Sequence, residues 1–272
     1  MTEFYNQVKE RLMRYARINT ESNPHSTSVP TTSCQHDLAK VIYEELQEIG
    51  ATNVYYDKDT CVVYGSLEAN VKTGRAIGFV THMDTAPDAS GKDVKPWVLE
   101  NYDGNDIVLN AEKDIVMSPS VFPNLKQYIG QDLILTDGTT LLGGDDKASI
   151  APVMTLLEYL VKHPEIKHNF ISVAFTPDEE VSGLAKDLDL ERFKSPIAYT
   201  LDGDHLGYYM DETFNASLST IEIHGISVHT ATAKGIMKNA VDIGNAFLNK
   251  LPALEKPQYT QGREGFYHVV SF

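Results

Sequence analysis

The amino-acid sequence predicts an α/β fold, with a mixed, largely parallel sheet sandwiched by helices. Two observations predict this class. Segments in which apolar residues recur at helical spacing alternate along the chain with short runs rich in Val, Tyr, Phe and Ile, which are typical of strands. Polar residues also gather directly after several of those runs, where the sheets of α/β proteins carry their functional groups. Strands and helices that alternate in this way favour a sheet covered on both faces.

The N-terminal part is expected to form two helices and then three strands. Apolar residues recur every three or four positions over residues 4–15 and again over 38–46, and Gly50 ends the second helix. The strands are expected at 52–57, 61–67 and 76–82. The third of them is apolar enough to be a central strand.

The middle of the chain is expected to hold a small subdomain followed by regular structure. Between Ser90 and Gly138 the pattern loosens and Gly, Pro and Asp are scattered through it, which indicates a long elaboration of the fold. Beyond it we expect a helix at 147–163, a strand at 170–176, a helix after Glu180 and a strand at 197–202.

A second unit is expected to begin near residue 208. Residues 216–228 alternate between apolar and polar like a half-buried strand, and residues 237–251 have the pattern of an amphipathic helix. Together they indicate the start of an α+β module. We therefore assign residues 1–207 to a first domain and residues 208–272 to the beginning of a second.

Composition and charge exclude several classes of partner and site. The formal net charge of the chain is −15, so phosphate backbones and anionic membranes should repel it, and we expect neither nucleic acid nor a membrane as partner. No segment reaches the ~20 apolar residues of a membrane span, and the N-terminus lacks the apolar stretch of a signal peptide. The two cysteines, Cys34 and Cys61, have no CxxC spacing and offer no thiolate zinc site. These features favour a cytoplasmic protein.

The strand expected at 76–82 ends in a possible metal ligand. His82 and Asp84 are two positions apart, so they can share a face, with the imidazole on a metal and the carboxylate orienting it. A hydrogen-bonded histidine beside a turn aspartate is the common alternative.

Carboxylates follow three further segment ends. Asp145 and Asp146 stand between two glycines and a helix; one Asp would suffice as an N-cap, so the pair hints at a metal site. Glu179 and Glu180 follow the strand at 170–176; they could simply favour the start of the next helix, but adjacent side chains point in different directions, so one could bind a metal while the other moves a proton. Asp202 could be a turn residue.

Taken together, these segment ends bring one histidine and several carboxylates to one edge of one sheet. This ligand set suits a pair of hydrolytic zinc or manganese ions. Such ions lie ~3.5–4 Å apart and need a bridging ligand, for which a carboxylate is suited.

The motifs around these residues resemble those of the peptidase T family, whose members remove the N-terminal residue from tripeptides. The resemblance rests on THMDTAPD, LTDGTTLLGGDDKASIA, VAFTPDEEVSGLAKDLD and AYTLDGD, and it continues through SGKDVKPWVLENYDGNDIVL, FNASLSTIEIHG and EGFYHVVSF. It implies a zinc-exopeptidase-like catalytic domain with an inserted α+β lid domain, and small peptides with a free N-terminus as substrates. Another exopeptidase or deacylase of the same zinc clan is the nearest alternative.

The resemblance also implies a role for each site residue. His82 and Asp202 would bind one zinc, Asp145 would bridge the two ions, and Glu180 would bind the second zinc. Asp84 would support His82, and Glu179 would be the general base that acts on a zinc-activated water. In the lid, His229 would reach the substrate, although the family's VHPG is replaced here by Val228, His229, Thr230 and Ala231.

Members of this family continue well beyond the position of Phe272, where they complete the lid and supply a last histidine to the second zinc. The resemblance thus implies two zinc ions per complete subunit, with one ligand absent from this chain. His205 and His268 do not occupy the missing motif. We therefore expect a truncated chain with at most one tightly bound zinc and little activity of its own, or a non-catalytic metal-binding fragment. The oligomeric state is not predicted.

Overall fold

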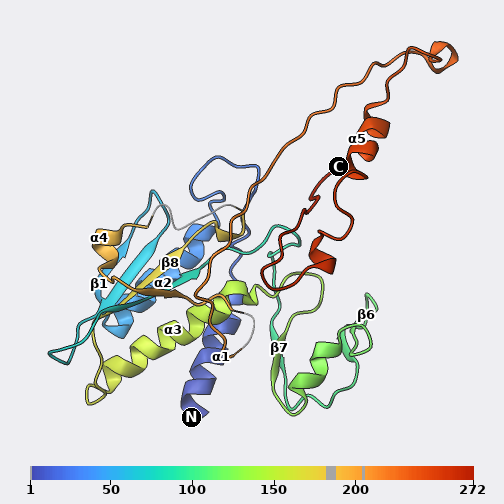
Figure 1. Cartoon of the computed structure of the whole chain (residues 1–272). Helices are drawn as coiled ribbons and strands as arrows, with labels where there is room; N and C mark the ends of the chain where they lie inside the picture. Colours follow the sequence, from blue (N-terminus) through green and yellow to red (C-terminus); the bar gives the residue numbers. More distant parts are fainter. Residues whose placement is uncertain (1, 182–187, 204–205) are drawn as a thin grey trace. The chain divides into compact units, whose positions relative to one another are not determined.

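The structure of the chain is a computed structural model that describes residues 2–181, 188–203 and 206–272 (Figure 1). The chain divides into two compact units, Met1–Tyr209 and Met210–Phe272. The first unit contains the main sheet and the predicted site residues of the first domain.

The main sheet is mixed, as predicted. Its strands lie in the order β1, β2, β8, β3, β9. β3 pairs in parallel with both β8 and β9, whereas β2 is antiparallel to β1 and β8. The strands are β1 (Thr52–Tyr56), β2 (Val63–Leu67), β3 (Ile77–His82), β8 (Ile171–Thr176) and β9 (Ala198–Thr200). The parallel half places the carboxyl ends of β8, β3 and β9 at one edge, where functional groups of α/β sheets gather.

Helices cover both faces of this sheet. α1 (Thr2–Ala16), α2 (Gln35–Ile49) and α3 (Gly144–Lys162) bury their apolar faces in one large cluster with β2 and β8. On the opposite face, Phe193 of the short helix α4 (Leu190–Phe193) packs on Tyr64 and Val80. Gly50 ends α2 in a left-handed conformation at φ 86°, which a glycine adopts without steric cost. The predicted helices at the N-terminus and the covered sheet are confirmed.

The segment from Ser90 to Gly138 forms a subdomain with its own small core, as predicted. β4 (Trp97–Leu99) pairs with β7 (Leu133–Leu135), and β5 (Ile107–Asn110) pairs with β6 (Ile115–Met117). Together with the 3₁₀ helix η1 (Pro123–Tyr128), these strands surround a separate cluster of buried apolar residues: Tyr102, Ile107, Leu125 and Leu135.

The second unit differs from its prediction. The strand expected at 216–228 is wrong: within Met210–Phe272 the structure assigns only an isolated bridge between Ile226 and Lys238. A strand requires a neighbouring strand for its backbone hydrogen bonds, and the described part of this unit offers none alongside 216–228. The predicted helix is present but shorter, as α5 (Ala240–Leu248), with the 3₁₀ helices η4 (Thr230–Thr232) and η5 (Pro257–Tyr259) before and after it.

Element boundaries around the site also shift. The helix expected after Glu180 falls mostly on residues 182–187, which lie outside the described residues; η2 (Glu179–Val181) and α4 stand on either side of them. β9 ends at Thr200, two residues before Asp202. Asp202 therefore lies in the segment after the strand, where its side chain can turn toward the end of β3.

Candidate metal centre

His82 lies at the carboxyl end of β3 and is almost completely buried, at 2% exposure. Its Nδ1 lies 3.1 Å from the backbone oxygen of Asp84 and 3.3 Å from Asp84 Oδ1, both of which are acceptors. A proton on Nδ1 satisfies this environment and leaves the lone pair of Nε2 available. In metal sites, a histidine is oriented by this kind of contact to its second nitrogen.

Carboxylates from three other segments surround Nε2 of His82. Asp145 Oδ1 lies 3.0 Å away, Asp202 Oδ2 3.8 Å and Glu179 Oε2 3.9 Å. Ligand atoms of His82, Asp145 and Asp202 all lie within 4.8 Å of one another. Two ligands of one tetrahedral zinc, each at about 2.0–2.1 Å, stand roughly 3.3 Å apart, so the donor types and spacings of this group fit a zinc ion.

The start of α3 is irregular, and this irregularity places Asp145. Gly143 has a left-handed backbone at φ 71°, and Asp145 and Asp146 depart from helical geometry before the regular helix begins. The Asp145 side chain is therefore directed to His82, while the carboxylate of buried Asp146 accepts a hydrogen bond from the backbone N–H of His82 at 3.2 Å. Neither aspartate is the N-cap of α3, since Gly143 is, without a side-chain cap.

Asp84 connects the end of β3 to the turn that carries Glu179 and Glu180. Its fully buried carboxylate accepts the backbone N–H of Glu179 at 2.9 Å and of Glu180 at 3.1 Å. The same carboxylate lies against Nδ1 of His82. Asp84 thus positions the imidazole and the glutamate turn together.

The carboxylates make the site strongly electronegative. Burial alone lowers the pKa of His82, but the hydrogen bond with Asp84 and the charges of Asp84, Asp146 and Glu179 outweigh burial and raise the pKa to about 10. A site that favours an imidazolium cation should also favour a metal cation.

The pKa values of the acidic groups are raised, and burial is the largest cause in each case. Burial and then the charge of Asp202 raise the pKa of Glu179, against the opposing effect of His82, and burial and then Asp145 raise the pKa of Glu180. Burial raises the pKa of Asp146 to about 7. Raised pKa values are typical of carboxylates that take up protons in catalysis.

Other predicted residues are not brought into this cluster. Within the described residues, the group of mutually close ligand atoms includes neither Glu179 nor Glu180, although the backbones of both are held by Asp84. His229 belongs to the second unit, where its Nδ1 accepts the backbone N–H of Ala231 at 3.2 Å and caps η4. His205 lies outside the described residues.

The sequence did not predict several residues that fix the backbone of the site residues by hydrogen bonds. The sequence predicts a helix cap or a place in a metal-binding pair for Asp146, and no separate role for Asp178, which contacts Thr31 and Gln35. The position of Asp178 beside Glu179 was a signal for it. Nothing in the sequence marks Thr31 and Gln35, which lie more than a hundred residues away.

Comparison with known proteins agrees with the motifs. Residues 212–271 match the family described as the peptidase dimerisation domain. Proteins named Peptidase T from Geobacillus kaustophilus and Caldanaerobacter subterraneus are 50% and 49% identical to the chain over 267 residues. Each alignment covers 98% of this chain and 65% of the relative, so the chain spans about 65% of the length of these relatives.

Solved structures share the fold. The aminopeptidase PepT from Bacillus cereus aligns with a TM-score of 0.56 and 22% identity, over 91% of this chain and 57% of that one. A tripeptidase from Staphylococcus aureus aligns with a TM-score of 0.58 and 18% identity, over 94% of this chain and 58% of that one.

The chain shares the fold of these two solved structures, and His82, Asp145 and Asp202 lie together in it as possible metal ligands. The chain is a homologue of the relatives named Peptidase T, which confirms the resemblance inferred from its motifs.

In the part of the chain that the structure describes, no helix combines the length and apolar character needed to cross a membrane.

Proposed function

We propose that the protein is a zinc-dependent aminopeptidase that removes the N-terminal residue from tripeptides. The observation that carries the proposal is the convergence of Asp145, Asp202 and Glu179 on Nε2 of His82, in a chain about half identical to proteins named Peptidase T. A buried imidazole facing several carboxylates at the carboxyl edge of a parallel sheet is suited to metal-assisted hydrolysis.

The residues would share the work as follows. His82, Asp145 and Asp202, which lie together, would hold the first ion. Asp145, whose carboxylate is 69% exposed, has a second oxygen to offer to a second ion together with Glu180. We expect a further ligand of that ion to come from outside these 272 residues. When bound, zinc supplies Lewis-acid activation of a water molecule and of the peptide carbonyl.

Glu179 is suited to proton transfer. Its side chain is half exposed, so a water and a substrate can reach it, and its Oε2 lies near Nε2 of His82. Its raised pKa brings it closer to neutral pH, where a base can take a proton from water and then return it to the leaving amine. Asp84 keeps the backbone of Glu179 fixed during this exchange.

The remaining assignments follow the same proposal. Residues 1–207 would be the N-terminal part of the catalytic domain and residues 208–272 the beginning of the lid, from which His229 would contact the substrate. The substrates would be small peptides with a free N-terminus, and the protein would act in the cytoplasm.

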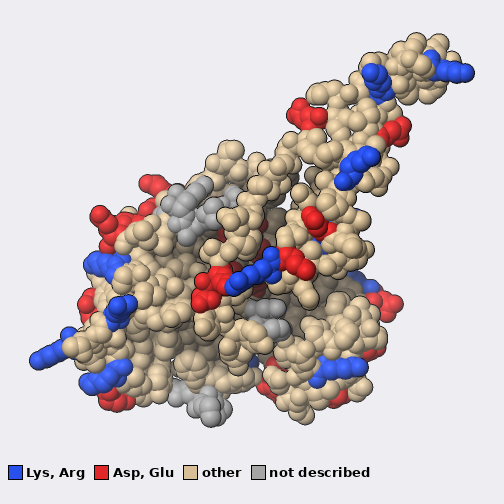
Figure 2. All heavy atoms as spheres, viewed as in Figure 1, with Lys and Arg blue, Asp and Glu red and all other residues tan. Residues whose placement is uncertain are grey.

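On the face shown in Figure 2, acidic and basic side chains are interspersed, so this face presents no single large basic surface among the described residues.

Hydrolysis assays on the product of the full reading frame that contains these residues would test the proposal. A tripeptide with a free N-terminus should release its first amino acid, the N-acetylated tripeptide should not be cleaved, and activity should disappear with a chelator and return with zinc. Cleavage of the acylated peptide alone would favour a deacylase of the same clan. Binding of one ion or none, without hydrolysis of either peptide, would favour a non-catalytic metal-binding protein.

A further inference from the structure

Asp178 is the one acidic residue of the turn at 178–180 for which the proposed function has no use. It directly precedes Glu179, is 7% exposed and has a left-handed backbone at φ 59°. Aspartate and asparagine tolerate this conformation better than most residues. A buried carboxylate in such a position needs partners that satisfy its charge.

Gln35, the first residue of α2, and Thr31, four residues before it, provide those partners. The Asp178 carboxylate accepts the backbone N–H of Thr31 at 3.0 and 2.8 Å, the hydroxyl of Thr31, and Nε2 of the buried Gln35 at 2.7 Å. In return, the backbone N–H of Asp178 donates to Oε1 of Gln35 at 3.2 Å. The side-chain amide of Gln35 therefore pairs with both the carboxylate and the backbone of Asp178. We call Asp178, Thr31 and Gln35 the Asp178 cluster.

The Asp178 cluster and Asp84 hold the same turn from different segments. Asp84, after β3, accepts the backbone N–H groups of Glu179 and Glu180, while the Asp178 cluster fixes the residue just before them to the segment at 31–35. Glu179 itself makes no contact with Thr31 or Gln35 among the interactions of the described residues. Its carboxylate is thus placed by the backbone of the turn.

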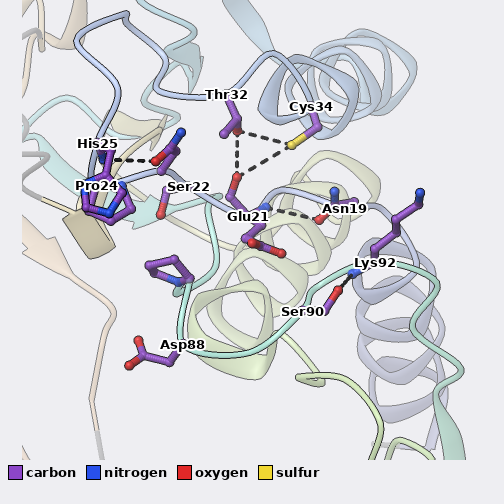
Figure 3. A pocket seen from close by; sticks show the side chains of 12 residues that line it. Asn19, Glu21, Ser22, Pro24, His25, Thr32, Cys34, Asp88, Ser90 and Lys92 are labelled. Atoms are coloured by element: carbon purple, nitrogen blue, oxygen red, sulfur yellow. Dashed lines mark hydrogen bonds between the residues drawn. The ribbon is translucent and has the colours of Figure 1, made fainter.

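The same segment forms one wall of a cavity of about 580 Å³. Thr32 and Cys34, which lie between Thr31 and Gln35 in the sequence, line it, and Figure 3 shows both side chains directed to the backbone oxygen of Glu21. The thiol of Cys34 is partly exposed. Its reactivity therefore reports on how firmly the segment at 31–35 is held.

We propose that Asp178 is a positioning residue for Glu179: through Thr31 and Gln35 it sets where the Glu179 carboxylate stands relative to His82. This inference rests on the proposed function for the role of Glu179. It concerns a contact network that does not include any of the residues assigned to the metal ions.

The geometry allows a reciprocal exchange of side chains as a test. In Asp178→Asn the shape and the tolerance of a left-handed backbone are kept, but the new NH₂ group faces either Nε2 of Gln35 or the backbone N–H of Thr31, so two donors oppose each other in both orientations of the new amide. Turning the Gln35 amide over would only move the conflict to the backbone N–H of Asp178. Gln35→Glu alone places two carboxylates in contact. The double variant restores an acceptor opposite every donor.

We expect each single variant to lower kcat about 10–100-fold, as the loss of groups that orient catalytic residues does, with KM nearly unchanged because the Asp178 cluster does not touch substrate. Labelling of Cys34 by a thiol reagent, located by peptide mapping, should become faster in each. The double variant should recover both kcat and the original labelling rate. Asp114→Asn is the matched control, since Asp114 also has a positive φ, at 54°, but lies exposed in the β5–β6 hairpin.

Unchanged kcat and labelling in both single variants, or failure of the double variant to recover either quantity, would overturn the proposal. A general loss of folding would lower the melting temperature of the single variants and would not be repaired selectively by the exchange. If the unaltered protein hydrolysed no peptide, the proposed function would fail, while the labelling rates of the four proteins would still decide whether the Asp178 cluster fixes this segment.

Discussion

At the residue scale, the site depends on side chains that are each held by a different part of the chain. His82 is oriented by Asp84 through Nδ1 and faces Asp145 through Nε2, and its backbone is held by Asp146. These contacts join two separate segments, the end of β3 and the start of α3, and each side chain makes different ones, so the effect of removing one side chain should follow from the contacts it makes. Glu179 and the two cysteines allow direct tests.

Replacing Glu179 by alanine should remove the proposed base without removing a ligand of the first ion. A lost general base typically slows a reaction about 10²–10⁴-fold, so hydrolysis by Glu179→Ala should fall by that factor while zinc content stays the same. Steady-state kinetics and elemental analysis would check both quantities. Glu191→Ala, which changes an exposed glutamate on α4, should have ordinary kinetics. Near-normal turnover of Glu179→Ala would show that another group takes the proton.

Thiol labelling should distinguish the two cysteines. Burial raises the pKa of the Cys61 thiol to about 12, so at pH 8 only about one molecule in ten thousand carries the reactive thiolate. Cys34, which is partly exposed, should react alone in the folded chain, and Cys61 should react only after denaturation. Below pH 12, any residual labelling of folded Cys61 should rise about tenfold per pH unit. Equal labelling of both residues in the native chain at pH 8 would contradict the buried position of Cys61.

The proximity of His82 and Asp202 could be predicted at this scale, because polar residues at the ends of parallel strands meet at one edge of the sheet, and Asp145 joins them from the start of α3. The catalytic and metal-binding roles stay predictions. The contacts from Asp146 to His82 and from Asp178 to Gln35 could not be foreseen. They depend on which loops pack together, and a sequence pattern of local spacing carries no information about that.

At the scale of elements, the start of α3 performs two tasks with adjacent residues. Asp145→Ala should lower the number of zinc ions bound, since Asp145 lies closest to Nε2 of His82. Asp146→Ala should keep the zinc content but leave the buried backbone N–H of His82 without an acceptor, at a cost of about 1–3 kcal/mol of unfolding free energy. Metal titration and denaturant unfolding would separate the two. The reverse ordering in metal content would mean that Asp146 is the bridging ligand.

Packing among α1, α2 and α3 should depend on Arg11. Its guanidinium, mostly buried, pairs with Glu45 at 2.7 Å, with Glu158, and with the hydroxyl of Thr155 at 2.8 Å. Arg11→Ala would leave Glu45 and Glu158 with only their more exposed ion-pair partners, Arg14 and Lys162, so the loss of unfolding free energy should approach about 3–5 kcal/mol, the cost of breaking a buried ion pair. Arg14→Ala is the matched control: Arg14 also pairs with Glu45, but its side chain is 53% exposed, so the loss should stay within about 1 kcal/mol. Equal losses of unfolding free energy in the two variants would show that the burial of the arginine side chain does not determine the effect.

Elements with both an apolar pattern and a covered face were predictable from the sequence. β3 was expected within one residue of its observed bounds, and α2 ends before Gly50 as expected but begins at Gln35, three residues before its predicted apolar pattern; both formed because tertiary packing agrees with their local pattern. The segment at 216–228 has a strand-like pattern without a strand. Alternating apolar residues would give this segment one apolar face if it were extended. A strand forms, however, only where a neighbouring strand supplies partners for its backbone hydrogen bonds.

At the scale of the whole molecule, acidic residues exceed basic ones, 38 against 23. The buried apolar residues are unevenly divided between the two units. Among the described residues, the buried apolar side chains run from Leu12 to Phe193. In Met210–Phe272 Gly244 alone is buried, while large apolar side chains such as Phe214, Leu218 and Phe272 are exposed. Local stability follows buried apolar contact, so the two units should differ in resistance to unfolding.

This difference predicts the course of limited proteolysis on the 272-residue chain. A protease of broad specificity should remove the second unit first, because a backbone with few buried contacts opens at little free-energy cost and is cleaved in the open state. A product that ends near Tyr209 should then persist, since it contains every buried apolar cluster together with His82, Asp145 and Asp202. Mass spectrometry of the digest would identify this product. It should bind as much zinc at the site of His82, Asp145 and Asp202 as the intact chain binds there. Zinc should slow its further digestion, because a ligand that binds only the folded form stabilises that form. Disappearance of both units at one rate would mean that Met210–Phe272 is stabilised as strongly as the first unit, in spite of its exposed apolar side chains.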